Sequence, residues 1–301
     1  MTTIPTLSNS PHLRGKTALV TGGTFGIGRA TAAGLARLGA GVVITGRSQA
    51  RAEEAVEFIQ RQSGSSDVSY LLADFLRPTE VRALAGAFIR TRSRLDILVN
   101  NAGGTFETRQ LMPEGLERTW ALNHLAYVQL TLSLLPLLRE SAPARVVNVA
   151  SGLYAGAINF EDLSAEKNFN RFRAYVHSKL ANHLFTYELA RRLAGTGVTV
   201  NAVNPGIVDT GLGSDAKGMQ KLLSSLLSPL KKSPEVGALP SLYMATSAEV
   251  EGVSGRFFDK TKFVEPRPVT RDHALQDRLW QVSLEQLGRS PDALATAVAE
   301  H

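Results

Sequence analysis

The sequence predicts an α/β protein, a single-domain Rossmann-type doubly wound parallel sheet with helices on both faces. Short apolar segments alternate with longer helical segments, which is the pattern of parallel strands joined by crossover helices. A cluster of glycines follows the first apolar segment and leads directly into a helix. The chain has 301 residues, of which 44% are hydrophobic, enough to build one large core.

Strands and helices are expected to alternate from residue 17 onward. The strands are expected at about 17–21, 41–46, 68–73, 95–100, 144–150, 198–204 and 255–258. The helices are expected at about 27–38, 49–62, 79–92, 114–139, 172–195, 235–246 and 272–287. No internal repeat or long linker suggests a second domain.

The loop after the first strand has the composition of a dinucleotide-binding turn. Glycine lets the backbone approach a ligand closely, and the amino end of the following helix offers unpaired N–H groups to a pyrophosphate. The spacing here is Thr-Gly-x-x-x-Gly-x-Gly, which departs from the G-x-G-x-x-G pattern. A glycine-rich turn without a ligand is the alternative interpretation. The candidate cofactor-binding residues in this loop are Thr21, Gly22, Thr24, Gly26, Ile27 and Gly28.

Two later strands end in polar or small residues. One runs into Asn101, Ala102 and Gly103, and another ends at Ser151. Ligands of open parallel sheets bind beyond the carboxyl ends of the strands, so both endings are expected to face the crevice that holds the glycine loop.

Tyr175 and Lys179 stand four residues apart on a predicted helix and therefore share one face. Acid catalysis by tyrosine at neutral pH needs its pKa lowered by roughly 3 units from ~10. One positive charge at ~4 Å in an effective dielectric of ~20 supplies energy of that order. The pair is thus a candidate acid–base centre, and the alternative is two amphipathic side chains on a helix surface.

With these motifs, the chain resembles the short-chain dehydrogenase/reductase family from about residue 14 to about residue 260. The resemblance implies a catalytic tetrad of Asn123, Ser151, Tyr175 and Lys179. Asn123 would anchor a water that links Lys179 to solvent, or would simply be a helix-interior Asn bonded to backbone. The resemblance also places Tyr175, Lys179, Pro205, Gly206 and Thr210 at the cofactor.

The spacing between two members of this tetrad is similar to the spacing in one branch of the family. Ser151 and Tyr175 are 175 − 151 = 24 positions apart, wider than is usual in the family. That insertion, with the sequence after Ser178, is similar to the retinol-dehydrogenase-like branch, which includes reductases of lipophilic carbonyls.

Cofactor choice is predicted from the end of the second strand. No acid stands where NAD-preferring relatives place an Asp, and Arg47 follows the strand. Its guanidinium could bind a 2′-phosphate, which predicts NADP(H), whereas the alternative is a solvated arginine. The resemblance also suggests that Asp74 contacts adenine, with capping of a turn as the other role considered.

The resemblance divides the chain into a flexible segment 1–13 and a dinucleotide-binding oxidoreductase domain 14–301 with a substrate lid at about 211–233. Within the lid, Leu222 and Leu226 recur at helical spacing after several glycines. We expect Met219, Leu222 or Leu226 to line an apolar pocket together with Leu153 and Tyr154. Ordinary core packing, or contact with a membrane surface through Lys231 and Lys232, would explain the same pattern.

Composition excludes several functional classes. The absence of cysteine excludes disulfides and thiolate catalysis. The six histidines lack metal-ligand spacing, so no metal is expected, and His177 and His183 are interpreted as surface or packing residues. The net charge of +6 comes from arginines scattered among acids, which does not predict nucleic-acid binding.

The expected location and partners follow from the same composition. No apolar run of about 18 residues is recognised, so no membrane span is predicted, and a cytoplasmic location is expected. The predicted partner is a small-molecule substrate, and the resemblance is compatible with either a homo-dimer or a homo-tetramer.

Two functions from different classes fit the sequence. The first is an NADP(H)-dependent oxidoreductase acting on a small lipophilic carbonyl or alcohol, with Tyr175 as general acid/base. The second is a catalytically silent cofactor-binding or sensing protein on the same fold. Loss of Tyr175 or Lys179 would mark the silent class, and both are present.

Overall fold

The computed structural model describes residues 13–206 and 233–290. The strands are β1 Thr17–Val20, β2 Gly41–Gly46, β3 Val68–Leu72, β4 Ile97–Asn100, β5 Ala144–Val149, β6 Val198–Asn204, β7 Phe257–Asp259 and β8 Lys262–Phe263. The helices are α1 Gly26–Arg37, α2 Gln49–Ser63, α3 Pro78–Thr91, α4 Arg118–Trp120, α5 Ala126–Glu140, α6 Arg171–Arg192, α8 Pro234–Thr246, α9 Pro268–Arg271 and α10 His273–Gln286.

The strands form one sheet in the order β3-β2-β1-β4-β5-β6-β7-β8. The first seven run parallel, and β8 pairs antiparallel with β7. The chain moves outward from β1 to β3 on one side and from β4 to β8 on the other, so the strand order reverses between β1 and β4. A crevice opens at such a switch point beyond the carboxyl ends of the strands. This confirms the predicted Rossmann-type α/β fold.

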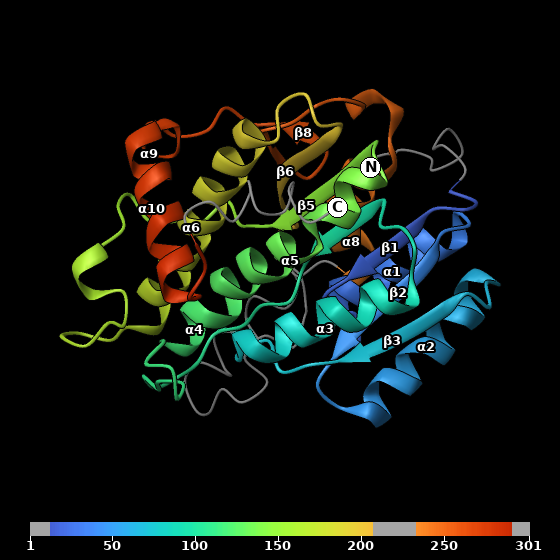
Figure 1. Cartoon of the computed structure of the whole chain (residues 1–301), viewed down its shortest axis with the longest axis horizontal. Coiled ribbons are helices and arrows are strands. Elements are labelled where there is room, and N and C mark those ends of the chain that lie inside the picture. The colour runs from blue at the N-terminus through green and yellow to red at the C-terminus, as the bar shows by residue number, and fades with distance from the viewer. Residues whose placement is uncertain (1–12, 207–232, 291–301) are drawn as a thin grey trace.

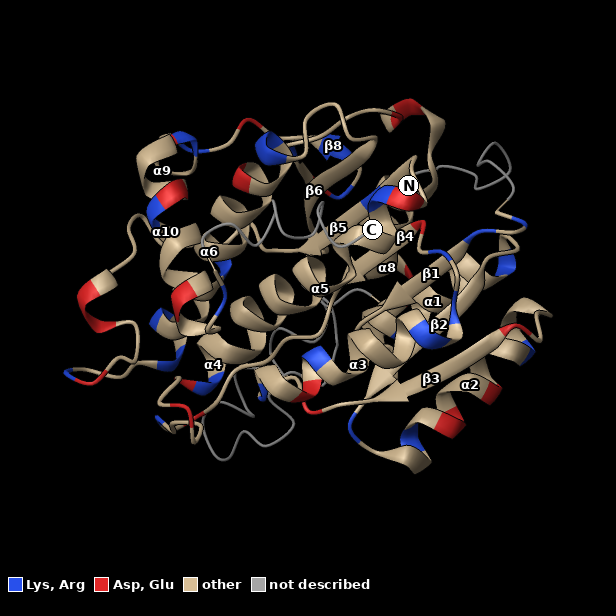
Figure 2. Cartoon of the chain, viewed as in Figure 1, with Lys and Arg blue, Asp and Glu red and all other residues tan. Residues whose placement is uncertain are grey.

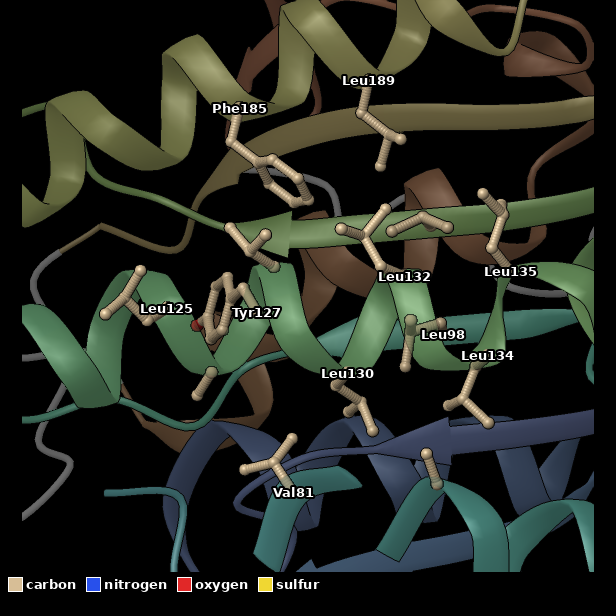
Figure 3. Close-up of a cluster of buried hydrophobic side chains, with 14 of the residues drawn as sticks. Val81, Leu98, Leu125, Tyr127, Leu130, Leu132, Leu134, Leu135, Phe185 and Leu189 are labelled. Carbon is tan, nitrogen blue, oxygen red and sulfur yellow. The ribbon is translucent and has the colours of Figure 1, made fainter. Parts of the chain in front are cut away.

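Helices cover both faces of the sheet (Figure 1). On one face α1 packs against α2 and α8, and on the other α3 packs against α5 and α6 adjoins β5 and β6. Each layer buries its own apolar cluster against the sheet. Figure 3 shows Phe185 and Leu189 of α6 in the same cluster as Leu130 and Leu132 of α5.

Most predicted elements are confirmed, with small shifts at their ends. The largest shift is in the helix expected from 114, which begins at Arg118 because the Glu117 carboxylate caps it by accepting a hydrogen bond from the backbone N–H of Trp120 at 3.0 Å. A π-helical turn, Ala121–Leu125, then joins α4 to α5. The short elements β8 and α9 were not predicted.

The C-terminal helix α10 packs on α6 of its own chain. Trp280 is 2% exposed and stacks on Phe185 with ring centroids 6.0 Å apart. The helix therefore extends the core layer built by α5 and α6.

Among the described residues, one helical segment qualifies by length and composition as a membrane span, which the sequence analysis did not recognise. It covers Arg118–Glu140, but 83% of its most apolar window is buried inside the molecule. Burial of this kind is also a property of core helices. Figure 2 shows basic and acidic residues interspersed over the described elements, as the sequence indicated.

Candidate active site

Two loops that follow neighbouring strands are bonded to each other at the switch point. The Thr21 hydroxyl oxygen accepts hydrogen bonds from the backbone N–H groups of Asn101 at 2.8 Å and Ala102 at 2.9 Å. The Asn101 side-chain amide donates in return to the carbonyl of Thr21 at 2.8 Å. The glycine loop after β1 and the Asn101–Gly103 loop after β4 thus form one unit.

Glycine is required in this unit for close packing. A Cβ atom on Gly28 would lie 2.3 Å from the carbonyl oxygen of Gly22 and 2.5 Å from the amide nitrogen of Asn101. Gly22 and Gly26 have φ values of 64° and 56°, in the left-handed region that favours glycine. The residues predicted from the glycine motif therefore shape the loop that borders the crevice.

The amino end of α1 is suited to an anion. Its N-cap residue, Phe25, makes no side-chain capping hydrogen bond, and the first turn contains no acidic residue. The first N–H groups of a helix have no partner within the helix and carry partial positive charge. The residues present therefore fit the pyrophosphate of a dinucleotide cofactor.

Arg47 and Asp74 lie at the ends of the next two strands. Arg47 is exposed and directly follows Gly46. Gly46 packs closely against the glycine loop, because a Cβ atom on it would lie 2.5 Å from the methyl group of Thr24. Asp74 accepts a hydrogen bond from the backbone N–H of Leu76 at 3.1 Å. The turn-capping role considered for Asp74 is therefore present, and its contact with adenine stays a prediction.

Ser151 and Tyr175 meet beyond the carboxyl end of β5. Ser151 is 7% exposed, and its side-chain oxygen accepts a hydrogen bond from the backbone N–H of Leu153 at 3.0 Å. Burial raises the pKa of Tyr175 above its usual value, and a hydrogen bond with the Ser151 side chain offsets only part of this. The phenol is therefore protonated at neutral pH.

Lys179 lies one turn after Tyr175 on α6, with its ammonium 5.7 Å from the centre of the tyrosine ring. The ammonium is buried and donates to the carbonyl of Val149 at 2.9 Å, and burial lowers the pKa of Lys179 to about 8. We expected Lys179 to lower the pKa of Tyr175. Desolvation of the phenol dominates instead, so the pKa of Tyr175 is raised.

Asn123 lies in the π-helical turn and is fully buried. Its amide oxygen accepts from the backbone N–H of Gly104 at 2.8 Å, and its amide nitrogen donates to the Gly104 carbonyl and to the Ser178 hydroxyl, each at 3.0 Å. Ser178 lies between the two catalytic candidates of α6. Asn123 therefore ties the loop after β4 to the helix that carries Tyr175, and its link to a water stays a prediction.

The remaining predicted residues follow β6 or lie beyond it. Pro205 and Gly206 come directly after this strand, and Gly206 has a φ of 80° and donates its N–H to the side chain of Asn204 at 3.2 Å. Thr210, the lid at about 211–233 except its last residue, and segment 1–12 lie outside the described residues.

Two exposed, large apolar side chains lie between Ser151 and Tyr175 in the sequence. Leu153 is 60% exposed and Phe172 is 61% exposed. The segment after Ser151 runs beside the start of α6, where Ala155 donates its N–H to the carbonyl of Val176 at 3.0 Å. Tyr154 is half-buried and packs against His183 at 4.2 Å between ring centroids, and its role in lining a substrate pocket stays a prediction.

Of the two interpretations of His183 as a surface or a packing residue, the structure confirms packing, and it adds a contact with the backbone of Ser151 that the sequence did not indicate. His183 is fully buried, and its Nε2 lies 3.0 Å from the carbonyl oxygen of Ser151. The signal that could have found it is spacing, because Tyr175, Lys179 and His183 follow one another at four-residue intervals on α6.

A cleft of about 900 Å³ lies at the amino ends of the strands, near the starts of β5 and β6. Lys16, Asp96 and Arg145 are among its lining residues, and it lies away from the catalytic candidates. Within residues 13–206 and 233–290, no cluster of His, Asp or Glu has the arrangement of a metal site.

Comparison with known proteins relates this chain to a known enzyme family. The family described as "short chain dehydrogenase" matches residues 16–221. Human retinol dehydrogenase 14 is 44% identical over 294 residues, covering 92% of this chain and 87% of the relative. Human retinol dehydrogenase 12 is 42% identical over 278 residues, covering 92% and 88%.

Solved structures share the fold. An uncharacterized protein from Mycobacterium paratuberculosis superposes with a TM-score of 0.76 at 29% identity, covering 94% of this chain and 97% of that one. A Pseudomonas aeruginosa RhlG/NADP active-site complex gives a TM-score of 0.66 at 32% identity, covering 83% and 96%. A 3-oxoacyl (acyl-carrier-protein) reductase from Agrobacterium tumefaciens with NADP bound gives 0.67 at 27%, covering 82% and 93%.

Proposed function

This chain belongs to the short-chain dehydrogenase family, a family of oxidoreductases, and we propose that it transfers a hydride between NADP(H) and the carbonyl or alcohol carbon of a small, lipophilic substrate. The observation that carries the proposal is the meeting of Ser151, Tyr175 and Lys179 at the carboxyl end of β5, two strands along the sheet from β1, which the glycine loop follows.

The three side chains divide the chemistry between them. In carbonyl reduction the bound cofactor supplies the hydride. The Ser151 hydroxyl donates a hydrogen bond to the substrate oxygen, and the protonated phenol of Tyr175 gives its proton to that oxygen. The Lys179 ammonium would hold the cofactor ribose and stabilise the phenolate that remains. Alcohol oxidation is the same path reversed.

Several features support NADP(H) and a lipophilic substrate. The strand that ends before Arg47 carries no acid at the position where one would repel a 2′-phosphate. Two solved structures of the same fold are complexes with NADP. The exposed Leu153 and Phe172 would offer apolar surface at the mouth of the site, and two of the relatives are named retinol dehydrogenases.

We expect Arg47→Ala to lower kcat/KM for NADPH by about tenfold to a hundredfold, because a charge-assisted hydrogen bond is worth about 1.5–3 kcal/mol. The value for NADH should change by less than about threefold, since NADH lacks the phosphate. Steady-state kinetics with both cofactors measures this. Arg61→Ala, which removes an exposed arginine at the far end of α2, is the control for charge alone. Equal losses with both cofactors would contradict the assignment.

For carbonyl reduction, kcat/KM for NADPH should be constant near neutral pH and should fall above about pH 8. Because the pKa of Tyr175 is raised, the phenol keeps its proton over this range. The pKa of Lys179 is lowered to about 8, so its positive charge is lost as the pH rises through that value. The profile of kcat/KM for NADPH, which reports the free enzyme, measures this. A rate that rises between pH 8 and 9 would contradict it.

Turnover tests the proposed function directly. The protein is incubated with NADPH and a panel of carbonyls of increasing apolar size, and with NADP and the matching alcohols, while the absorbance of the reduced cofactor is followed. Binding of NADPH without turnover across the panel would favour a cofactor-sensing protein. The proposal includes a cytoplasmic location and a homo-dimeric or homo-tetrameric assembly. It also includes a core role for the helical segment Arg118–Glu140.

A further inference from the structure

Helix α6 contacts the end of β5 at three successive turns. Tyr175 bonds the side chain of Ser151, Lys179 donates to the carbonyl of Val149 at 2.9 Å, and His183 lies 3.0 Å from the carbonyl of Ser151. Positions i, i+4 and i+8 lie on one stripe of a helix. The catalytic stripe of this chain therefore extends one turn beyond the Tyr-x-x-x-Lys motif.

The hydrogen-bond chemistry determines the protonation of His183. A carbonyl oxygen only accepts, so Nε2 must carry the hydrogen and donate it to Ser151. Burial lowers the pKa of His183 to about 4, because it outweighs the hydrogen bond with the Ser151 carbonyl, which raises the pKa, and the nearby charges of Lys179 and Arg267 lower it further. The ring is therefore neutral at physiological pH and stays in one tautomer.

Packing fixes the orientation of the ring. Tyr154 contacts the His183 ring at 4.2 Å between centroids, and Phe257 meets it edge-on at 4.6 Å. Tyr154 is itself held by Arg267, which lies 3.5 Å above its ring and donates to the carbonyl of Ala155 at 3.2 Å. His183 thus has little freedom to leave the Ser151 carbonyl.

We propose that His183 is a positioning residue that holds Ser151 against Tyr175 by donating its Nε2–H to the Ser151 carbonyl. The inference rests on the proposed function, in which the Ser151 hydroxyl orients the substrate oxygen. Ser151 lies beyond the last residue of β5, Val149, so regular strand pairing no longer fixes its backbone. The bond from α6 supplies that constraint, and His183 itself does not touch the reacting atoms.

Two substitutions separate the hydrogen bond from packing. His183→Leu keeps apolar bulk and removes the donor, whereas His183→Gln places an amide N–H near the position of Nε2. We expect kcat to fall about tenfold in the Leu variant, the size of one lost hydrogen bond, with the Kd for NADPH within about twofold of the parent. The Gln variant should recover kcat to within about threefold.

Hydrogen exchange gives a readout that does not depend on turnover. The amide of Leu153, bonded to the Ser151 side chain, should exchange roughly tenfold faster in the Leu variant and return toward the parent rate in the Gln variant. In the parent protein, ¹⁵N chemical shifts of the His183 ring should show hydrogen on Nε2 and a bare Nδ1. That measurement needs no variant to fold.

The outcomes are distinct. Three results would each overturn the role of His183. The first is an unchanged kcat and an unchanged exchange rate of the Leu153 amide in the Leu variant, and the second is hydrogen on Nδ1 in the parent. The third is an equal loss of kcat and NADPH affinity in the Leu variant that the Gln variant does not recover. A parent protein that turns over no carbonyl or alcohol would refute the proposed function alone, and exchange and the ring tautomer would then decide whether His183 holds Ser151.

Discussion

Replacing Tyr175 by Phe should lower turnover by about 10²- to 10⁴-fold while leaving the affinity for NADPH nearly unchanged. The ring and its packing are kept and only the hydroxyl is removed, so the loss equals the usual worth of a general acid. The hydroxyl bonds the Ser151 side chain and is protonated at neutral pH because burial raises its pKa. Single-turnover rates and fluorescence titration of NADPH measure the two quantities separately.

Lys179→Ala provides the comparison. Its ammonium is buried against the Val149 carbonyl at 2.9 Å and would also hold the cofactor ribose, so both turnover and NADPH affinity should fall. If the Phe variant instead kept more than about a tenth of the parent turnover, well short of the loss of a general acid, Tyr175 would not be the proton donor.

The fold could be predicted because its signals are local. The glycine cluster before α1 and the alternation of apolar strands with amphipathic helices are visible in the sequence, and strands β2 and β6 begin and end where they were expected. The π-helical turn Ala121–Leu125 was not predicted, because one extra residue in a turn leaves the apolar pattern of a continuous helix almost unchanged.

The site was predicted in part, for a related reason. The pairing of Tyr175 with Lys179 follows from helical spacing, and the structure brings both to Ser151. The direction of the tyrosine pKa shift does not follow from spacing, because it depends on how deeply the phenol is buried. The spacing of His183 places it on the same stripe of α6 as Tyr175 and Lys179, but spacing alone does not show a partner, because only the path of the chain after β5 brings the Ser151 carbonyl to it.

The second large effect is expected at Gly28. In Gly28→Ala the new methyl group would lie 2.3 Å from the carbonyl oxygen of Gly22 and 2.5 Å from the Asn101 amide. Both neighbours belong to the bonded unit of the two loops, so neither can move without breaking the hydrogen bonds that Thr21 and Asn101 share. Overpacking costs about 1–3 kcal/mol and each lost bond about 1 kcal/mol more.

We therefore expect Gly28→Ala to lower the free energy of unfolding by about 3 kcal/mol and to weaken NADPH binding by roughly a hundredfold or more, because the loop that approaches the pyrophosphate is pushed open. Urea unfolding and NADPH titration measure the two effects.

Gly86→Ala is the matched control, since it lies inside α3 and its new methyl would meet only the mobile end of Arg90 at 3.4 Å. That change should stabilise the protein by about 0.5–1 kcal/mol, as alanine does in a helix. If Gly28→Ala had the same free energy of unfolding and the same NADPH affinity as the parent protein, the two loops would separate freely. The cofactor would then have to bind elsewhere beyond the carboxyl ends of the strands.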